Sequence, residues 1–199
     1  MKTLKLTLLC CLISAFTYAE VSKTQKEALV AIYNATNGDS WKHSWDLEQP
    51  VSNWYGLSIE NDNIVAINLS FNNLNGNLPE DISLLKALRV LNLSFNKLEG
   101  ELPNTLTDIS SLEDLKLFSN RFNGEIPKTI GDLTNLKFLE LYNNDFVGEI
   151  PLSIGNLIKL ERLNLSSNLL MGKLPASISS LKSLKLLSLF DNNFLGTIP

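Results

Sequence analysis

Three residue types recur every 24 residues through most of this 199-residue chain. They are the asparagines Asn72, Asn96, Asn120, Asn144, Asn168 and Asn192, the glycines Gly76, Gly100, Gly124, Gly148, Gly172 and Gly196, and the prolines Pro79, Pro103, Pro127, Pro151, Pro175 and Pro199. A fixed period in this range is typical of a solenoid, in which stacked units share one core because a single unit cannot bury its own apolar face. The sequence therefore predicts an α/β solenoid, a fold that presents one long surface to a partner.

The residues from 88 to 103, LRVLNLSFNKLEGELP, show how one unit is expected to fold. Leu91 and Leu93 alternate with Val90, Asn92 and Ser94, which indicates a short strand with its leucines turned inward. Stacking of the units pairs such strands into a parallel sheet.

The recurring asparagine and proline are predicted to be scaffold. Asn96 enters a tight bend, where its side chain can bond the backbone of the bend and of the next repeat. A buried amide left unpaired would cost about 1–3 kcal/mol, so each rung needs its neighbour. After Pro103, Leu106, Ile109 and Leu112 recur every three residues. That spacing suits a short 3₁₀ or irregular helix on the convex side.

The pattern L-x-x-L-x-L-x-x-N-x-L, followed by x-G-x-[IL]-P, resembles the plant-type leucine-rich repeat. The resemblance covers residues 64–199 as six repeats, and the last stops at Pro199 without a convex helix or a closing unit. It implies a right-handed superhelix with a parallel concave sheet and short convex helices. Because terminal repeats are normally capped, we expect either a truncated product or a last rung that another molecule protects.

Residues 1–19 are predicted to be a secretory signal peptide. Lys2 and Lys5 precede an apolar stretch from 6 to 16, and Ala19 stands at the expected cleavage site. The apolar run is too short to be a membrane anchor. A lipoprotein signal is the other alternative because of Cys10 and Cys11, although no small residue precedes them. We therefore expect a secreted protein, extracellular or on the cell surface.

The charge of the mature chain argues against several partners. Without Lys2 and Lys5, 15 of the 17 basic residues remain against 21 acidic ones, a net charge of −6. Nucleic acid and anionic lipid both need a basic footprint, so neither is expected as a partner. No later segment is long and apolar enough for membrane insertion. Both cysteines would leave with the signal, so the mature fold must depend on its core.

Residues 20–63 break the period and are predicted to form an N-terminal cap made of a helix and a hairpin. Ser22 or Thr24 can begin the helix, with Gln25 or Glu27 three residues on as a capping box. The hairpin is expected to turn between residues 60 and 63 and to lead into the first repeat. The helix is expected to bury one apolar stripe, made of Ala28, Leu29, Ile32 and Tyr33.

The three tryptophans, Trp41, Trp45 and Trp54, all lie in this cap. A cap needs a large apolar area to cover an open core end, so their burial is expected, with a carbohydrate-stacking platform as the alternative. In related plant caps a cysteine pair flanks a W-x-G motif, whereas Ser52 and Ile59 stand there in this chain. The stretch ALVAIYNATNGDSW resembles instead the leader of secreted repeat proteins from bacteria and some algae.

Residues suited to catalysis are few. His43 is the only histidine and the mature chain would hold no cysteine, which excludes a Cys–His pair and a multi-histidine metal site. The glycines fall at the repeat spacing and form no phosphate loop. We expect no enzyme activity, no metal and no cofactor. Adjacent acids such as Glu113 and Asp114 leave a carboxylate glycosidase as the formal alternative.

The outward positions of the strands differ between repeats, and those of repeats three to five hold most of the charged and aromatic residues. Exposed aromatics flanked by charge are typical of an interface centre. The alternative is that Lys116 and Glu140 merely pair across adjacent strands while the aromatics stack on each other to stabilise the sheet. The outward residues of repeats one and two are by comparison uncharged and not aromatic. The predicted ligand-binding residues on the concave face are Asp114, Lys116, Phe118, Phe138, Glu140, Tyr142, Arg162 and Phe190.

Together these observations predict a secreted, non-catalytic leucine-rich-repeat module that binds a protein, a peptide or a surface glycan through its concave face. That face would offer about 500–700 Å², the low end for a stable protein interface. One alternative is an adhesive or assembly unit that self-associates through its uncapped C-terminal end, near Phe194 and Ile198. The other is an ectodomain fragment of a larger receptor.

Overall fold

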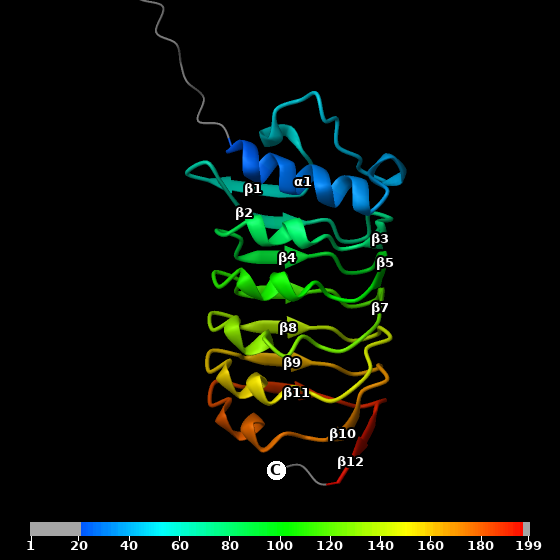
Figure 1. Ribbon diagram of the computed structural model, residues 1–199, viewed down its shortest axis with the longest axis vertical. Helices are drawn as coiled ribbons and strands as arrows, with labels where there is room; N and C mark the ends of the chain where they lie inside the picture. The colour runs from blue at the N-terminus through cyan, green and yellow to red at the C-terminus, as the bar shows by residue number, and fades with distance from the viewer. Residues whose placement is uncertain (1–20, 197–199) are drawn as a thin grey trace, which may run out of the picture.

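The computed structural model describes residues 21–196 of the chain, and it shows a stack of similar rungs. Helix α1 (Lys23–Ala35) crosses one end of the stack, and β12 lies at the other end (Figure 1). The signal peptide expected at residues 1–19 and Ile198 lie outside the described residues.

One long sheet runs along the whole stack, with its strands in the order β1-β2-β4-β6-β8-β9-β11. Its strands are β1 (Leu57–Glu60), β2 (Asn63–Asn68), β4 (Val90–Asn92), β6 (Asp114–Lys116), β8 (Phe138–Glu140), β9 (Arg162–Asn164) and β11 (Leu186–Ser188). From β2 onward every pair is parallel and in the register of the repeat, so that Leu91 faces Leu115 and Leu139 faces Leu163. The predicted parallel sheet is confirmed.

Shorter parallel strands line a second side of the stack. They are β3 (Asn75–Asn77), β5 (Lys97–Gly100) and β7 (Arg121–Phe122) in one sheet, and β10 (Met171–Lys173) and β12 (Asn193–Leu195) in another. A bridge between Glu125 and Val147 lies on the rungs between them. These strands follow the asparagine bend, where the chain turns to run toward the proline.

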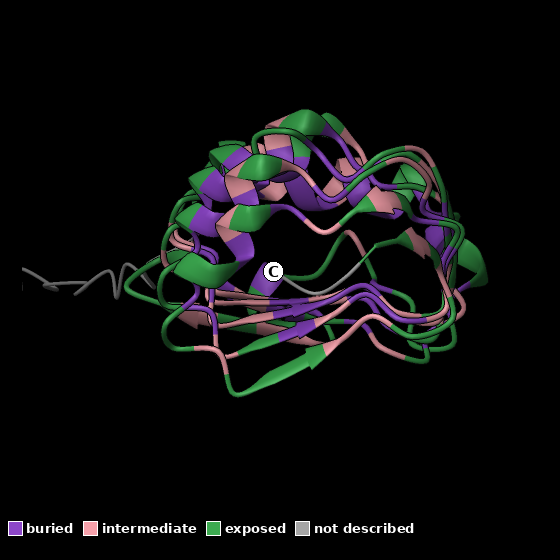
Figure 2. Ribbon diagram, turned by 90° about the horizontal axis from the view of Figure 1, so that it is seen from below, coloured by how far each residue is buried: buried purple, intermediate pink, exposed green. Residues whose placement is uncertain are grey.

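Short 3₁₀ helices form the layer opposite the long sheet (Figure 2). This layer contains η3 (Glu80–Leu84), η4 (Asn104–Asp108), η5 (Ile130–Asp132), η6 (Leu152–Asn156) and η7 (Ala176–Ser180), while η1 (Gly38–Ser40) and η2 (Val51–Asn53) precede the first repeat. The predicted three-residue spacing of Leu106, Ile109 and Leu112 places all three in the core, fully buried. Buried residues line the inner sides of both layers, so the core is one continuous column.

The recurring asparagines form the expected ladder, in which Asn72, Asn144 and Asn168 are buried, but it runs in the opposite direction. The Nδ2 of Asn96 donates to the carbonyl of Leu93 in its own bend and to that of Leu69 in the preceding repeat, both at 2.9 Å. Its Oδ1 accepts from the backbone N–H of Leu74, also in the preceding repeat. The prediction that the side chain bonds the next repeat is therefore wrong. The backbone N–H and carbonyl groups of each bend that point toward the next repeat are therefore hydrogen-bonded by the recurring asparagine of that next repeat.

Residues 21–63 form a helix and a hairpin at the first rung. The Oγ of Ser22 accepts the backbone N–H of Gln25 at 3.3 Å, so the helix begins where the sequence allowed. Gln25 does not close a capping box on the Ser22 backbone. Its Oε1 accepts from the N–H of Ile64 at 2.8 Å, and its Nε2 donates to the carbonyl of Asp62 at 3.1 Å. The glutamine therefore ties α1 to the β1–β2 hairpin.

The hairpin and the apolar stripe of α1 are both as predicted. Asn61 and Asp62 form the turn with positive φ angles of 48° and 63°, the conformation that a two-residue hairpin turn requires. The stripe residues of α1, namely Ala28, Leu29, Ile32 and Tyr33, are buried. Across residues 21–196, no helix has the length and apolar character needed to span a membrane.

The three tryptophans are core residues. Trp41, Trp45 and Trp54 are 5%, 3% and 4% exposed, and Trp45 lies within 4.9 Å of both other rings by centroid distance. Each indole N–H donates to a backbone carbonyl, as buried tryptophan requires. No ring face is left for a sugar, so the carbohydrate-platform alternative is wrong and burial is confirmed.

Candidate functional site

Three adjacent strands, β6, β8 and β9, bring most of the predicted site residues together. Their central leucines, Leu115, Leu139 and Leu163, are fully buried. The residues on either side of each leucine therefore point to the outer face of the long sheet, because side chains alternate along a strand. The parallel register sets Phe138 between Asp114 and Arg162.

Two ion pairs lie on this face. The Nζ of Lys116 is 2.6 Å from the Oδ2 of Asp114 on its own strand, and the Nη1 of Arg162 is 3.2 Å from the Oε1 of Glu140 on the neighbouring strand. Lys116 and Glu140 are register partners, yet each takes another partner. The Lys116–Glu140 pair of the alternative is therefore wrong, because Asp114 lies two residues away on the same face and competes for the ammonium. The other part of that alternative, stacking of the aromatics on each other, is confirmed for Phe118 and Tyr142.

Phe138 lies close to both cations. The Nζ of Lys116 is 5.8 Å from the centre of the phenyl ring, and the guanidinium carbon of Arg162 is 6.0 Å from it. Both distances are within the range of a cation–π attraction. We call Asp114, Lys116, Phe138, Glu140 and Arg162 the ionic cluster.

The cations of this cluster are more exposed than their carboxylates, of which Glu140 is buried and Asp114 is partly buried. The side chain of Arg162 is 49% exposed against 9% for Glu140, and that of Lys116 is 32% exposed against 16% for Asp114. Among the side chains described, the Oδ1 of Asp114 is the one buried oxygen without a hydrogen-bond partner. The ionic cluster therefore presents positive charge outward on a chain whose formal net charge is −4.

Four aromatic rings follow one another beside the ionic cluster. Phe118 and Tyr142 stack at 4.3 Å with an interplanar angle of 9°, and Phe71 and Phe95 stack at 4.0 Å with an angle of 16°. Phe95 meets Phe118 edge to face at 5.0 Å, which joins the two pairs. We call Phe71, Phe95, Phe118 and Tyr142 the aromatic row.

Phe71 and Phe95 were missed by the sequence analysis, which treated repeats one and two as bland. Both have a positive φ, at 57° and 55°, and they occupy a bend position that later repeats fill with Ser119, Asn143 or Ser167. This bend position lies one residue beyond the three outward strand positions. Two phenylalanines in a column of small polar residues were the signal that could have identified them.

Tyr142 links the aromatic row to the ionic cluster. Burial raises the pKa of its phenol, and the negative charge of Glu140 raises that pKa further. The hydroxyl is therefore held in its neutral form and can donate a hydrogen bond to a partner.

Phe190 stands apart from both groups. It is 69% exposed on the rung of β11, and Ser166 takes the equivalent position on the rung between it and Tyr142. The structure therefore brings together seven of the eight predicted residues and leaves Phe190 outside them.

The described residues offer no clear constellation for catalysis. His43 stacks on Tyr55 at 4.4 Å in the N-terminal segment. Glu113 pairs with Lys137 at 2.7 Å, whereas Asp114 pairs with Lys116 on the outer face. The two carboxylates are therefore engaged with different lysines and do not form the carboxylate pair that a glycosidase would need. Between residues 21 and 196, no three histidine, cysteine, aspartate or glutamate side chains gather as metal ligands would.

Comparison with known families agrees with this geometry. Residues 75–195 match the model of the leucine-rich repeat region, and residues 63–85 match that of a single leucine-rich repeat. The first match alone spans more than half of the chain.

Solved structures of plant receptors are similar as well. The ectodomain of GASSHO1/SCHENGEN3 from Arabidopsis thaliana, in complex with CASPARIAN STRIP INTEGRITY FACTOR 2, is 34% identical with a TM-score of 0.84 over 88% of this chain. The Arabidopsis receptor kinase HAESA, in complex with the peptide hormone IDA and the co-receptor SERK1, is 31% identical with a TM-score of 0.79 over 87% of this chain. The ectodomain of SOBIR1 from Arabidopsis thaliana is 25% identical with a TM-score of 0.73 over 88% of this chain.

The lengths of these proteins differ. This chain spans 22% of the GASSHO1/SCHENGEN3 ectodomain and 30% of HAESA, but 97% of the SOBIR1 ectodomain. The repeat pattern, the parallel sheet and the family match agree, and the chain belongs to the leucine-rich-repeat family.

Proposed function

We propose that this chain is a secreted, non-catalytic leucine-rich-repeat module that binds a protein or peptide through the outer face of its long sheet. The observation that carries the proposal is that the ionic cluster and the aromatic row adjoin each other on consecutive rungs. The proposed binding residues are Asp114, Lys116, Phe118, Phe138, Glu140, Tyr142 and Arg162, with Phe190 as an outlying contact.

The composition of this surface supports the proposal. Aromatic and arginine side chains are enriched at the centres of protein interfaces, where they contribute most of the binding energy. The solved structures of GASSHO1/SCHENGEN3 and HAESA are both complexes, the first with CASPARIAN STRIP INTEGRITY FACTOR 2 and the second with the peptide hormone IDA and the co-receptor SERK1. The similarity of this chain to those ectodomains favours a protein or peptide as its partner.

The wider organisation is part of the same proposal. Residues 1–19 act as the signal peptide, residues 20–63 cap the solenoid, and residues 64–199 form six repeats in a right-handed superhelix. The buried tryptophans and the Gln25 tether support the role of residues 20–63 as a cap. Signal cleavage is tested by sequencing the N-terminus of the exported protein, with Glu20 expected as the first residue.

The binding proposal is tested by capture of partners on the immobilised chain. The bait is presented to the secreted and surface proteins of the source organism, beside a Phe118→Ala, Tyr142→Ala double variant. Both rings are partly exposed, so the double variant should keep the circular dichroism spectrum of the native chain. A partner held by the native chain and lost by the variant supports the site. Equal capture by both would place the binding surface elsewhere.

Self-association is a second candidate, because the last described rung exposes residues of the core column. Leu187 is 36% exposed, whereas its counterpart Leu163 on the preceding rung is fully buried. Phe194 is only partly buried, whereas its counterparts Phe122 and Phe146 are fully buried. Sedimentation equilibrium across the micromolar range distinguishes the cases. Reversible dimers weakened by Leu187→Ser support assembly, and a constant monomer mass contradicts it.

A further inference from the structure

We infer that the outer face takes an extended acidic peptide, and that Phe71 and Phe95 belong to its binding site. In this arrangement a carboxylate of the peptide lies over Lys116 and Arg162, and its apolar side chains lie along the aromatic row. The inference rests on the proposed function, and it names the chemistry of the partner.

The charge preference follows from which half of each ion pair is accessible. A partner that approaches the ionic cluster meets the exposed guanidinium of Arg162 and the ammonium of Lys116 before it reaches the carboxylates beneath them. Both cations lie about 6 Å from the centre of one phenyl ring, that of Phe138, so one carboxylate placed beside them is attracted by both. A basic partner would instead meet like charge in a partly desolvated place, which disfavours binding.

The stacking of the aromatic row disfavours a glycan. A sugar binds an aromatic side chain through the flat face of the ring. Here the faces are used within the row, because Phe71 covers Phe95, Tyr142 covers Phe118, and the two pairs meet edge to face. The row therefore leaves fewer free ring faces than four separate rings would, and it offers ring edges to a partner. Ring edges carry partial positive charge, which suits the carbonyl oxygens of a peptide and its carboxylates.

The backbone at Phe71 and Phe95 supports their assignment to the site. A positive φ costs a residue with a bulky side chain more than it costs serine, asparagine or aspartate, which the other repeats have at this bend position. Phe71 is nevertheless 57% exposed and Phe95 41% exposed, so burial in the core does not explain the choice of phenylalanine. The bend itself is common to all repeats, so it is the placing of exposed rings there that supports a role in binding.

The size and position of the two groups fit an extended chain. From Phe71 to Tyr142 the aromatic row crosses three steps of about 4.8 Å, or about 14 Å in total, which about five extended residues can span. Lys116 and Phe118 are two residues apart on one segment. A peptide with an acidic residue close to its apolar residues can therefore contact the ionic cluster and the aromatic row together.

The test uses three pools of labelled peptides of about eight residues, the length class that such a surface can hold. All pools share apolar positions randomised among leucine, valine, phenylalanine and tyrosine, and the central residue is glutamate, glutamine or lysine. A neutral glucan hexasaccharide and a polyuronate hexasaccharide are the glycan probes. Binding to the full chain is measured by fluorescence anisotropy at low and at high salt.

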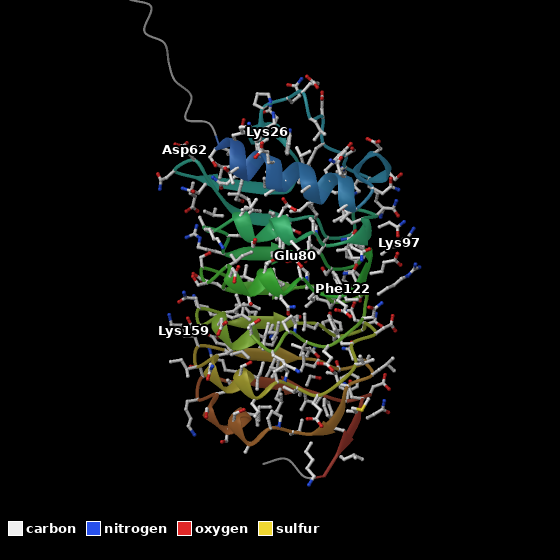
Figure 3. The ribbon with its side chains drawn as sticks, viewed as in Figure 1. Lys26, Asp62, Glu80, Lys97, Phe122 and Lys159 are labelled. Atoms are coloured by element: carbon white, nitrogen blue, oxygen red, sulfur yellow. The ribbon has the colours of Figure 1, made fainter. Side chains whose placement is uncertain are left out.

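Variants separate the contributions. The Asp114→Asn, Lys116→Gln, Glu140→Gln, Arg162→Gln variant removes both exposed cations without leaving either carboxylate as an unpaired charge. Phe71→Ser with Phe95→Ser installs the residue found at the same bend position in later repeats. Lys97→Gln is the matched control, because Lys97 is an exposed lysine on β5, on another side of the stack (Figure 3).

The glutamate pool is expected to bind about tenfold more tightly than the glutamine pool at low salt, and the difference should shrink at high salt. The charge variant should abolish this preference, the Phe71 and Phe95 variant should weaken binding of both pools, and Lys97→Gln should change neither. Equal binding of the glutamate and glutamine pools overturns the inference, as does polyuronate binding as tight as that of the glutamate pool.

Two further outcomes would also overturn it. Unchanged binding by the Phe71 and Phe95 variant would remove those residues from the site. Failure of every peptide pool would reject an acidic peptide as the partner. The proposed function is decided separately, because capture that depends on Phe118 and Tyr142 can succeed when all pools fail.

Discussion

The backbone N–H of His43 donates to the Oδ1 of Asn72 at 2.7 Å, across 29 residues of sequence. In later repeats the same oxygen of the recurring asparagine accepts from the preceding rung, as Asn96 does from Leu74. The N-terminal segment therefore supplies to the first rung the donor that a preceding repeat would supply. This hydrogen bond, together with the one from the N–H of Lys42 to the Asn72 carbonyl, continues the ladder into residues 21–63.

Asn72→Ala should destabilise the junction between the N-terminal segment and the first repeat. The side chain is fully buried, so its removal leaves the His43 N–H without a hydrogen-bond acceptor and lowers the free energy of unfolding by about 1–3 kcal/mol. Urea unfolding should show this loss, and hydrogen exchange should show faster exchange at His43. The exposed Asn123→Ala is the control and should change the free energy of unfolding by less than about 0.5 kcal/mol.

Phe122→Ala should be among the most destabilising single changes in the chain. Its ring is fully buried in the core (Figure 3), and its centre lies 6.2 Å from that of the buried Phe146 ring. Truncation of a buried phenylalanine costs about 3–5 kcal/mol through lost burial and the cavity left behind. Thermal and urea unfolding measure the effect. Phe190→Ala removes the same group from an exposed position, and a comparable loss there would contradict the assigned burial.

Gly76→Ala should loosen α1 from the first repeat. A Cβ at this position would lie 2.2 Å from the carbonyl oxygen of Ala35, at the end of α1, and the φ of 128° is itself unfavourable for alanine. We expect a loss of about 1–3 kcal/mol beyond the backbone cost. Gly196→Ala is the matched control, because its φ is also positive at 87° but the nearest atom to a Cβ is 3.9 Å away. Equal losses in the two variants would show that the close approach to α1 contributes nothing.

Two ion pairs, Glu113 with Lys137 and Glu161 with Lys185, lie just before the strands of the long sheet and are sensitive to pH. The hydrogen bond from Lys137 lowers the pKa of Glu113, and the bond from Lys185 lowers the pKa of Glu161. A carboxyl group with a lowered folded pKa stabilises the chain above its unfolded pKa of about 4.5, and this contribution is lost as the pH falls through the folded value. The pairs are exposed, so the contribution to the free energy of unfolding is small.

The same pairing acts in the opposite sense on the lysine. The hydrogen bond to Glu113 raises the pKa of Lys137 above 10.5, so its contribution is present below that pH and is lost as the pH rises through the folded value. Lys137→Gln should move the carboxyl titration of Glu113 in carbon-detected NMR to higher pH. The titration of Glu161 should move less, because Lys185 remains bonded to it. An unmoved Glu113 would show that the ion pair does not form in solution.

The period of the sequence predicted the solenoid well, because one set of contacts is repeated. Leu115 and Leu139 are buried because side chains alternate along each strand and the stacked repeats cover the inner face of the sheet. The 3₁₀ layer follows from the three-residue spacing of Leu106, Ile109 and Leu112. The direction of the asparagine ladder could not be predicted, because the sequence does not state whether a bend's free groups face forward or backward along the stack.

The sequence by itself determined the repeat, the parallel sheet and the family, because these depend on a pattern that every rung shares. Only the tertiary structure decided which charges pair and which rings touch. Lys116 has Asp114 on its own strand and Glu140 as its register partner on the next strand, and the folded structure pairs it with Asp114. The bend at Phe71 and Phe95 likewise turns their rings onto the row of Phe118 and Tyr142, although the four occupy two different positions of the repeat.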